Sequence, residues 1–123
     1  GIERAGDICS FPLLDHKHTP LRWGEFAAAH KISGFTPDRI THFGYYALVI
    51  RAAIAGQGLA LVPRGLIADE LASGKLINPQ GYGFISNHAY WLTCPDDRPQ
   101  RPAMRLFLEW LLEEVRSMPA EMR

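Results

Sequence analysis

The most apolar stretch of the chain lies at its middle, over residues 44–63. Arg51 is the only charged residue between positions 45 and 55. Because a helix that is apolar nearly all round is buried on more than one side, we expect a central, buried helix here. Gly56 follows, where a helix C-cap favours a positive φ. Residues 59–62 are continuously apolar, which predicts a strand covered on both faces in the middle of a sheet.

Two shorter apolar runs precede this stretch and predict further strands. Residues 11–14 (FPLL) form the first, and residues 39–43 (RITHF) form the second. Between them, Thr19 followed by Pro20 is a helix start signal, an N-cap with proline at the first helical position. Four residues then repeat at helical spacing and define a buried face: Trp23, Phe26, Ala27 and His30.

The second half of the chain predicts four more elements. Residues 66–73 have a helical pattern, with an inner side made of Leu66, Ile67 and Leu71. Residues 75–78 are short and extended, and residues 89–94 (AYWLTC) have the composition of a strand. Residues 95–102 are rich in proline and charge, as in linkers, and residues 103–116 predict a helix. Strands that alternate with helices imply an α/β fold, an open parallel sheet with helices on both faces.

Composition narrows the function classes. The 123 residues are enough for one domain with a core, and 13 basic and 13 acidic residues give a net charge of zero. This balance argues against nucleic-acid binding by this chain itself, because phosphate contacts need a positive face. No apolar run approaches the ~20 residues of a membrane span, and no signal peptide is present, so we expect a cytoplasmic protein without a membrane partner.

The start of the chain and the two cysteines add two expectations. The start, GIERAGD, has no initiator methionine, so we expect a chain cut from a longer one. Cys9 and Cys94 stand alone, without the spacing of a metal or redox motif. Two reduced thiols are the preferred interpretation, and a disulfide is the alternative.

No motif carries catalytic chemistry. Gly56 and Gly58 resemble part of a dinucleotide-binding fingerprint, but they follow a helix and precede a strand, the reverse of what that site requires. No serine lies in a nucleophile elbow, and Asp69 and Glu70 point to different sides of their helix. We therefore expect no enzyme activity, no catalytic residue and no cofactor.

Two other motifs have weak support. His16 and His18 lie on one side of an extended segment, and His30 or His42 could join them as metal ligands. Only Asp15 stands near them in sequence, so a solvated loop is preferred and a metal site is the alternative. The segment LIADELASGKLI suggests a helix-turn-helix, but a second helix and a basic excess are missing.

One edge of the predicted sheet remains as a candidate ligand site. Ligands of open parallel sheets bind outside the carboxyl ends of the strands, here residues 14–16, 43–45 and 62–64. Gly44 also begins the central helix, where free N–H groups and the helix dipole favour an anion. Three side chains can add donors: Tyr45, Tyr46 and Arg64. The alternative is that Gly44 only lets the chain turn and the tyrosines pack.

Four stretches match one known family in order and spacing. Residues 52–79 (AAIAGQGLALVPRGLIADELASGKLINP) are the most specific, with a helix, a glycine turn, a strand ending in proline, and a second helix. FPLL, residues 89–95 (AYWLTCP) and residues 107–114 (FLEWLLEE) are the others. Together they resemble the effector-binding domain of LysR-type transcriptional regulators, most closely the subgroup around the glycine-cleavage activator.

The resemblance implies a fold like type 2 periplasmic binding proteins, in which a small metabolite lies in a cleft between two α/β lobes. Residues 1–10 would be a lead-in after the first inter-lobe crossover, and residues 11–94 the second lobe. Residues 95–102 would be a return linker, and residues 103–123 the C-terminal helix and tail. The family's winged helix-turn-helix, its linker helix and most of the first lobe have no counterpart in this sequence.

The resemblance also implies a function. The chain would sense a small, anionic effector, assemble as a homo-oligomer, and control DNA binding by a separate N-terminal domain through a population shift. Its effector contacts, combined with the sheet edge, fall at seven residues: Asp15, His16, Phe43, Gly44, Tyr45, Pro63 and Arg64. The alternatives are a fragment of a solute-binding transport protein of the same fold and a small α/β enzyme.

Overall fold

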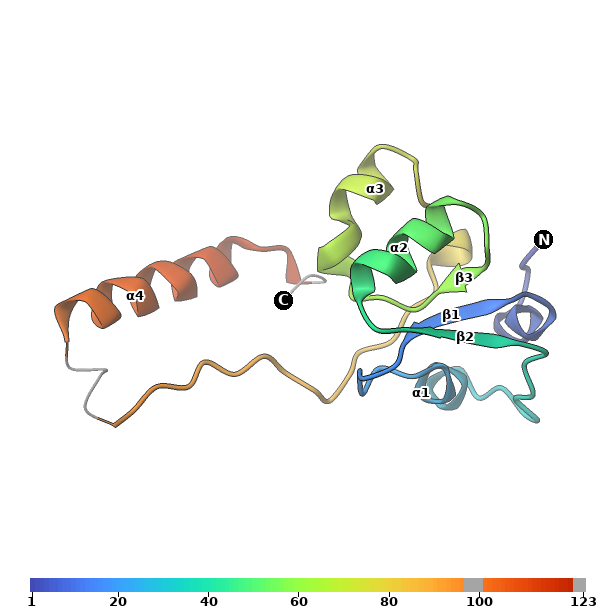
Figure 1. The fold of residues 1–123 in the computed structure, drawn as a ribbon, viewed down its shortest axis with the longest axis horizontal. Helices are drawn as coiled ribbons and strands as arrows, with labels where there is room; N and C mark the ends of the chain where they lie inside the picture. The colour runs from blue at the N-terminus through green and yellow to red at the C-terminus, as the bar shows by residue number, and fades with distance from the viewer. Residues whose placement is uncertain (97–100, 121–123) are drawn as a thin grey trace. The chain divides into compact units, whose positions relative to one another are not determined.

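The computed structural model describes residues 1–96 and 101–120 and divides the chain into two compact units, Gly1–Asn87 and His88–Arg123 (Figure 1). The first unit holds a parallel sheet with helices, and the second holds one long helix. No helix among the described residues is both long and apolar enough to cross a membrane.

The sheet has three parallel strands, β1 (Leu13–His16), β2 (Ile40–Phe43) and β3 (Leu59–Ala60), in the order β2-β1-β3. The predicted parallel α/β class is confirmed. The central strand, however, is β1, so the placement of residues 59–62 in the middle of the sheet was wrong. An apolar run predicts burial, but the order of strands depends on packing partners that are distant in sequence.

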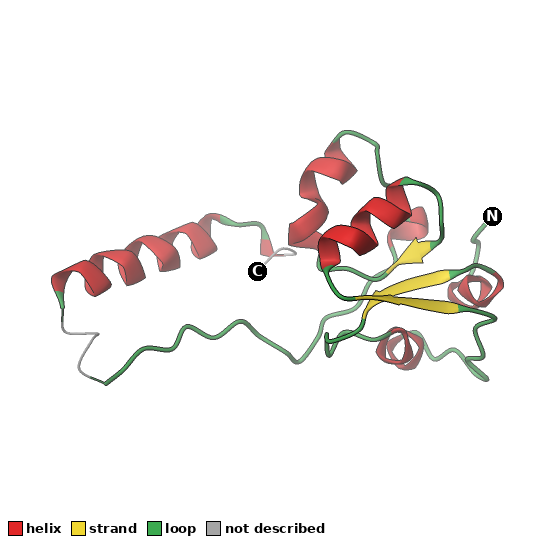
Figure 2. Cartoon of the chain, in the orientation of Figure 1, coloured by secondary structure: helices red, strands yellow, loops and turns green. Residues whose placement is uncertain are grey.

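Helices cover both faces of the sheet, as predicted (Figure 2). Side chains alternate along β1, so Leu13 packs with helix α1 (Trp23–Ala29) on one face and Leu14 packs with helix α2 (Tyr46–Ile54) on the other. The indole N–H of Trp23 donates to the Leu14 carbonyl at 3.1 Å and fastens α1 to the strand.

Helix α1 begins later than the sequence suggested. Thr19 and Pro20 do not start it, since Arg22 is the N-cap and Trp23 the first helical residue. The Thr19 hydroxyl instead accepts the Leu21 amide at 3.2 Å and the Tyr46 phenol at 2.7 Å. A tertiary contact therefore uses the oxygen that would have capped a helix.

Helix α2 is buried on one side only within this unit. Val49 and Ala52 are buried, whereas Leu48 and Ile54 are 48% and 44% exposed. The expectation of burial on more than one side was therefore wrong for the part of the chain described. Gly56 follows the helix with φ +74°, which agrees with the predicted C-cap turn.

The segment after β3 is less regular than predicted. A 3₁₀ turn, η2 (Arg64–Ile67), leads into a short helix, α3 (Ala68–Ala72). Leu66 was expected on the inner side but is 48% exposed. Residues 75–78 belong to no helix or strand, Asn78 has extended φ and ψ angles, and a further 3₁₀ turn, η3 (Pro79–Gly81), follows.

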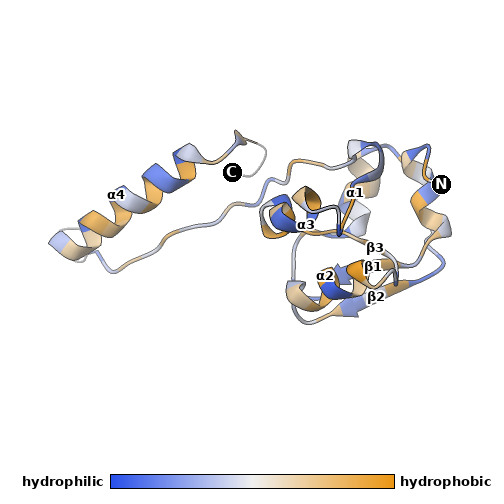
Figure 3. Cartoon of the chain, turned by 90° about the horizontal axis from the view of Figure 1, so that it is seen from above, coloured by the Kyte–Doolittle hydropathy of each residue, from blue (hydrophilic) through white to orange (hydrophobic). Residues whose placement is uncertain are grey.

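The second unit contains helix α4 (Pro102–Ser117), which confirms the predicted C-terminal helix. Its apolar and polar residues are visible in Figure 3. Residues 89–94 do not form the predicted strand, and Tyr90 and Trp91 are 92% and 84% exposed. Strand composition needs a neighbouring strand for its hydrogen bonds, and the described residues supply none here. Part of the predicted linker, residues 97–100, lies outside the described residues.

A capped turn and two thiols complete the description. Turn η1 (Ala5–Ser10) is capped by Asp7, whose carboxylate accepts the backbone N–H groups of Glu3 and Arg4, each at 2.9 Å. These hydrogen bonds, the one from Arg4 most and the one from Glu3 next, hold the pKa of Asp7 below its usual range. Cys9 and Cys94 are both free thiols.

Candidate functional site

The carboxyl ends of the strands bring two of the candidate segments together. His16, at the end of β1, is in register with Phe43, at the end of β2. The Lys17 amide continues the ladder by donating to the Phe43 carbonyl at 2.7 Å. Three of the predicted residues, Asp15, His16 and Phe43, therefore lie side by side at one edge of the sheet.

A polar cluster forms where this edge meets the start of α2. The ring of His16 lies against the ring of Tyr46, with centroids 4.6 Å apart, and the Tyr46 hydroxyl donates to Thr19. The His18 amide donates to Nδ1 of His16 at 3.0 Å. Since Nδ1 is an acceptor, the neutral His16 ring carries its proton on Nε2 and offers a donor there.

Thr19 was not among the residues selected from the sequence, and Tyr46 was noted only as a possible donor. The signal for Tyr46 is its place in the first turn of a helix that follows a strand. No local pattern distinguishes Thr19 from an ordinary helix cap, because its partner lies 27 residues away.

The start of α2 lies two residues later than expected. Tyr45 is the N-cap and Tyr46 the first helical residue, so Gly44 precedes the helix instead of beginning it. Tyr45 supplies no side-chain cap and is 72% exposed. A Cβ added at Gly44 would meet no atom within 4 Å. The backbone before α2 is therefore open to approach, and a side chain at Gly44 would occupy that open space.

Asp15 points away from the polar cluster and into the protein. Its side chain is 1% exposed, and one carboxylate oxygen contacts Nδ1 of His42. The other lies 3.5 Å from Nε of Arg22. Asp15 and His16 are adjacent in a strand, so they lie on opposite faces: Asp15 on the α1 side and His16 on the α2 side.

Pro63 and Arg64 follow the same end of the sheet on the other side of β1. The Leu61 amide donates to the Leu14 carbonyl at 3.3 Å, so the chain still runs beside β1 after β3 has ended. Pro63 then caps η2, and Arg64 begins it with an exposed side chain. The parallel sheet places this segment at the same edge as His16 and Phe43.

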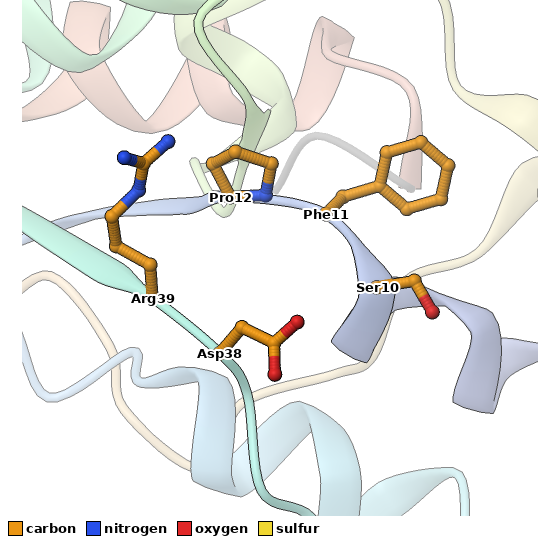
Figure 4. Close-up of a pocket in the computed structure, with 5 residues that line it drawn as sticks. All are labelled: Ser10, Phe11, Pro12, Asp38 and Arg39. Carbon is orange, nitrogen blue, oxygen red and sulfur yellow. The ribbon is translucent and has the colours of Figure 1, made fainter.

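A cavity of about 380 Å³ lies at the opposite end of the strands. Figure 4 shows its lining, which comes from the two segments that lead into β1 and β2: Ser10, Phe11, Pro12, Asp38 and Arg39. These are the amino ends of the strands, whereas ligands of open α/β sheets bind at the carboxyl ends. The cavity is therefore not the candidate site.

The alternative of a histidine metal site gains no support from the part of the chain that the structure describes. Within the described ranges, no group of three or more His, Cys, Asp or Glu side chains is arranged to hold a metal ion. His16 uses Nδ1 as an acceptor for the His18 amide, and His30 contacts the Gly83 carbonyl at 2.8 Å.

Comparison with known proteins identifies a family. The model of the LysR substrate binding domain matches residues 4–116. The transcriptional activator AmpR of Providencia stuartii is 38% identical over 121 residues, which are 92% of this chain and 40% of that protein. The glycine cleavage system transcriptional activator of Escherichia coli K12 is 30% identical over 109 residues, 89% of this chain and 35% of that protein. The chain thus spans well under half of these relatives.

Two solved structures have the same fold. The effector domain of AmpR from Pseudomonas aeruginosa matches with a TM-score of 0.79 and 28% identity, over 94% of this chain and 55% of that domain. The AmpR effector-binding domain from Citrobacter freundii matches with a TM-score of 0.69 and 28% identity, over 95% of this chain and 58% of that domain. The predicted fold class is confirmed by both.

Proposed function

We propose, since the chain belongs to the LysR substrate binding domain family, that it is the effector-sensing part of a LysR-type transcriptional regulator. It binds a small, anionic metabolite and controls DNA binding by a separate N-terminal winged helix-turn-helix. It acts in the cytoplasm, in a homo-oligomer, without catalysis and without a cofactor. The observation that carries the proposal is the family match together with a donor-rich edge at the carboxyl ends of the strands.

The domain organisation follows the same reasoning. Residues 11–94 form the second lobe, residues 95–102 return towards the first, and residues 103–123 form the C-terminal helix and tail. The chain covers 55% and 58% of the two AmpR effector domains, which supports a partial two-lobed domain. A solute-binding transport protein of the same fold is less well supported, because the relatives are described as transcriptional activators.

The effector site comprises His16, Phe43, Gly44, Tyr45, Pro63 and Arg64, at the edge where the strands end, with Asp15 behind them. An anion is favoured because N–H donors and the positive end of the α2 dipole meet there. Binding at this edge would favour one arrangement of the lobes and so shift the population of DNA-binding states.

We expect Gly44→Val to weaken effector binding by the intact regulator about tenfold or more. The side chain would fill the space through which an anion reaches the backbone at the start of α2, and this removes a charge-assisted contact. The measurement is isothermal titration with the effector, which mass spectrometry of molecules co-purified with the regulator identifies. A thermal melt of each variant accompanies it.

Gly6→Val is the matched control. Gly6 is exposed and lies in η1, which precedes the amino end of β1, and an added Cβ meets no atom within 4 Å there either. It should leave affinity and melting unchanged. If Gly44→Val lowers the melting temperature sharply, the glycine is structural. If Gly44→Val changes neither the effector affinity nor the melting temperature, the effector site lies elsewhere.

We expect the chain to self-associate. The residues of α4 include four large apolar side chains that are 46–67% exposed: Leu106, Phe107, Trp110 and Leu112. Exposed apolar surface of this extent usually binds a partner. Light scattering at rising concentration should give a mass above 13.8 kDa, and Trp110→Glu should restore the monomer. A monomer at high concentration that binds no hydrophobic dye would contradict this prediction.

A further inference from the structure

The proposed effector site does not explain why the carboxylate of Asp15 is buried. Its side chain is 1% exposed, although taking an ionised carboxylate out of water costs several kcal/mol unless it is paired. Two basic partners contact it, Nδ1 of His42 through one oxygen and Nε of Arg22 at 3.5 Å through the other. With both oxygens engaged, Asp15 has little left to offer a ligand directly.

The two partners, in contrast, reach solvent. The side chains of Arg22 and His42 are 44% and 43% exposed. Arg22 is fixed twice, since its Nη1 also donates to the Lys17 carbonyl at 3.1 Å. The second ring nitrogen of His42, Nε2, lies on the side of the imidazole away from Asp15. Because both side chains contact one carboxylate, they lie next to each other with their directions fixed.

Basic residues lie close to this pair in the sequence. Asp15 is the only acidic residue from position 8 to position 24, whereas Lys17 and Arg22 are cationic and His16 and His18 lie in the same loop. Arg22 neutralises Asp15. Lys17, whose backbone carbonyl accepts from Nη1 of Arg22, adds a second cation beside the pair.

We propose that Arg22 and His42 form an oxyanion-binding pair on the α1 side of the sheet edge, and that Asp15 is the residue that positions them. The remaining N–H groups of Arg22 and the second ring nitrogen of His42 can act as hydrogen-bond donors to a carboxylate or phosphate group. This inference deepens the proposed function and rests on it. The pair would hold an anionic group on the α1 side of the sheet edge, whereas His16 and the start of α2 lie on the other side of the strands.

Sulfate is a suitable ligand for the test, because it keeps its double charge over the range in which histidine titrates. The 123-residue chain is titrated with sodium sulfate against sodium chloride at constant ionic strength and pH 6, near the ordinary histidine range. The readouts are the Arg22 Nε–H and His42 ring resonances. We expect both to shift saturably and together, with one dissociation constant.

Four substitutions locate the site. Arg22→Gln and His42→Gln should each weaken sulfate binding about tenfold, as expected for the loss of one charge-assisted contact. Asp15→Asn should weaken sulfate binding similarly. It should also shift the Arg22 Nε–H resonance in the absence of sulfate. If this variant melts like the parent, that shift shows that Asp15 positions Arg22, because a purely structural role does not predict it. Arg39→Gln is the matched control, since Arg39 lies at the other end of β2 and its loss removes the same charge.

The outcomes separate this inference from the proposed function. Two results would show that the pair is not an anion site. In the first, the chemical shifts change linearly with sulfate and change as much at Arg39 and Lys17 as at Arg22 and His42. In the second, Arg22→Gln and His42→Gln bind sulfate as tightly as the parent. Should Asp15→Asn fail to fold, the two glutamine variants still decide. A third outcome is that sulfate binds saturably but Gly44→Val leaves the effector response of the intact regulator unchanged. That result would support this inference and contradict the effector site given under the proposed function.

Discussion

Leu13→Ala should destabilise the protein by about 2–5 kcal/mol, the cost of a large-to-small change in a well-packed core. Leu13 lies on the central strand with no exposed surface and packs with Ile8, Trp23 and Phe26. Neighbours on β2, β3 and α1 enclose it, so the cavity cannot easily collapse. Urea unfolding followed by circular dichroism measures the loss.

Leu61→Ala is the matched comparison. Leu61 packs against the same cluster but is only half-buried and lies beyond the end of the edge strand β3. Its truncation should cost clearly less than that of Leu13, since less apolar surface is lost from the core. An equal or larger loss at Leu61 would contradict this difference in burial, since it would mean that Leu61 contributes as much to the core as Leu13.

Gly58→Ala should be nearly as damaging, at about 3 kcal/mol or more, because the added methyl group cannot be accommodated. Its Cβ would lie 2.4 Å from the backbone carbonyl oxygen of Pro12. That same oxygen accepts the Leu59 amide at 2.9 Å, so moving the two segments apart would break the ladder between β1 and β3. Thermal and urea unfolding report the effect.

Gly83→Ala provides the control for Gly58→Ala. An added Cβ at Gly83 meets no atom within 4 Å, and its φ is not in the left-handed region. The substitution should change the free energy of unfolding by less than about 0.5 kcal/mol. If Gly58→Ala were as mild as this control, the close approach of β3 to β1 would not be as tight as the structure has it.

The two glycines of the turn after α2 illustrate how far sequence reasoning reaches. Gly56 was expected to take a positive φ because it follows a helix, and it does. Gly58 was assigned to the same turn, yet its role is a close approach to Pro12, 46 positions earlier in the chain. A helix end is a local signal, whereas the identity of the residue that crowds a glycine is not.

The candidate site also has a part that the sequence predicted and a part that only the structure shows. The rule that ligands bind at the carboxyl ends of parallel strands selected His16, Phe43 and Gly44, and the register places His16 beside Phe43. Whether these residues contact the effector stays a prediction. The pairing of Asp15 with Arg22 and His42, and of Thr19 with Tyr46, was not available from any spacing, because these partners are separated by 7 to 27 residues.

The sequence by itself determined the α/β class, the parallel sheet, the glycine turn after α2, the helix at the C-terminal end and the family to which the chain belongs. Each of these depends on periodicity, caps or a run of matching residues, which are properties of neighbouring positions. The tertiary structure alone decided that β1 is central, that α2 is buried on one side, and that Asp15 turns inward. The physical reason is that strand order, burial of a particular face and pairing of charges are set by contacts between distant segments, which compete with and override local preference.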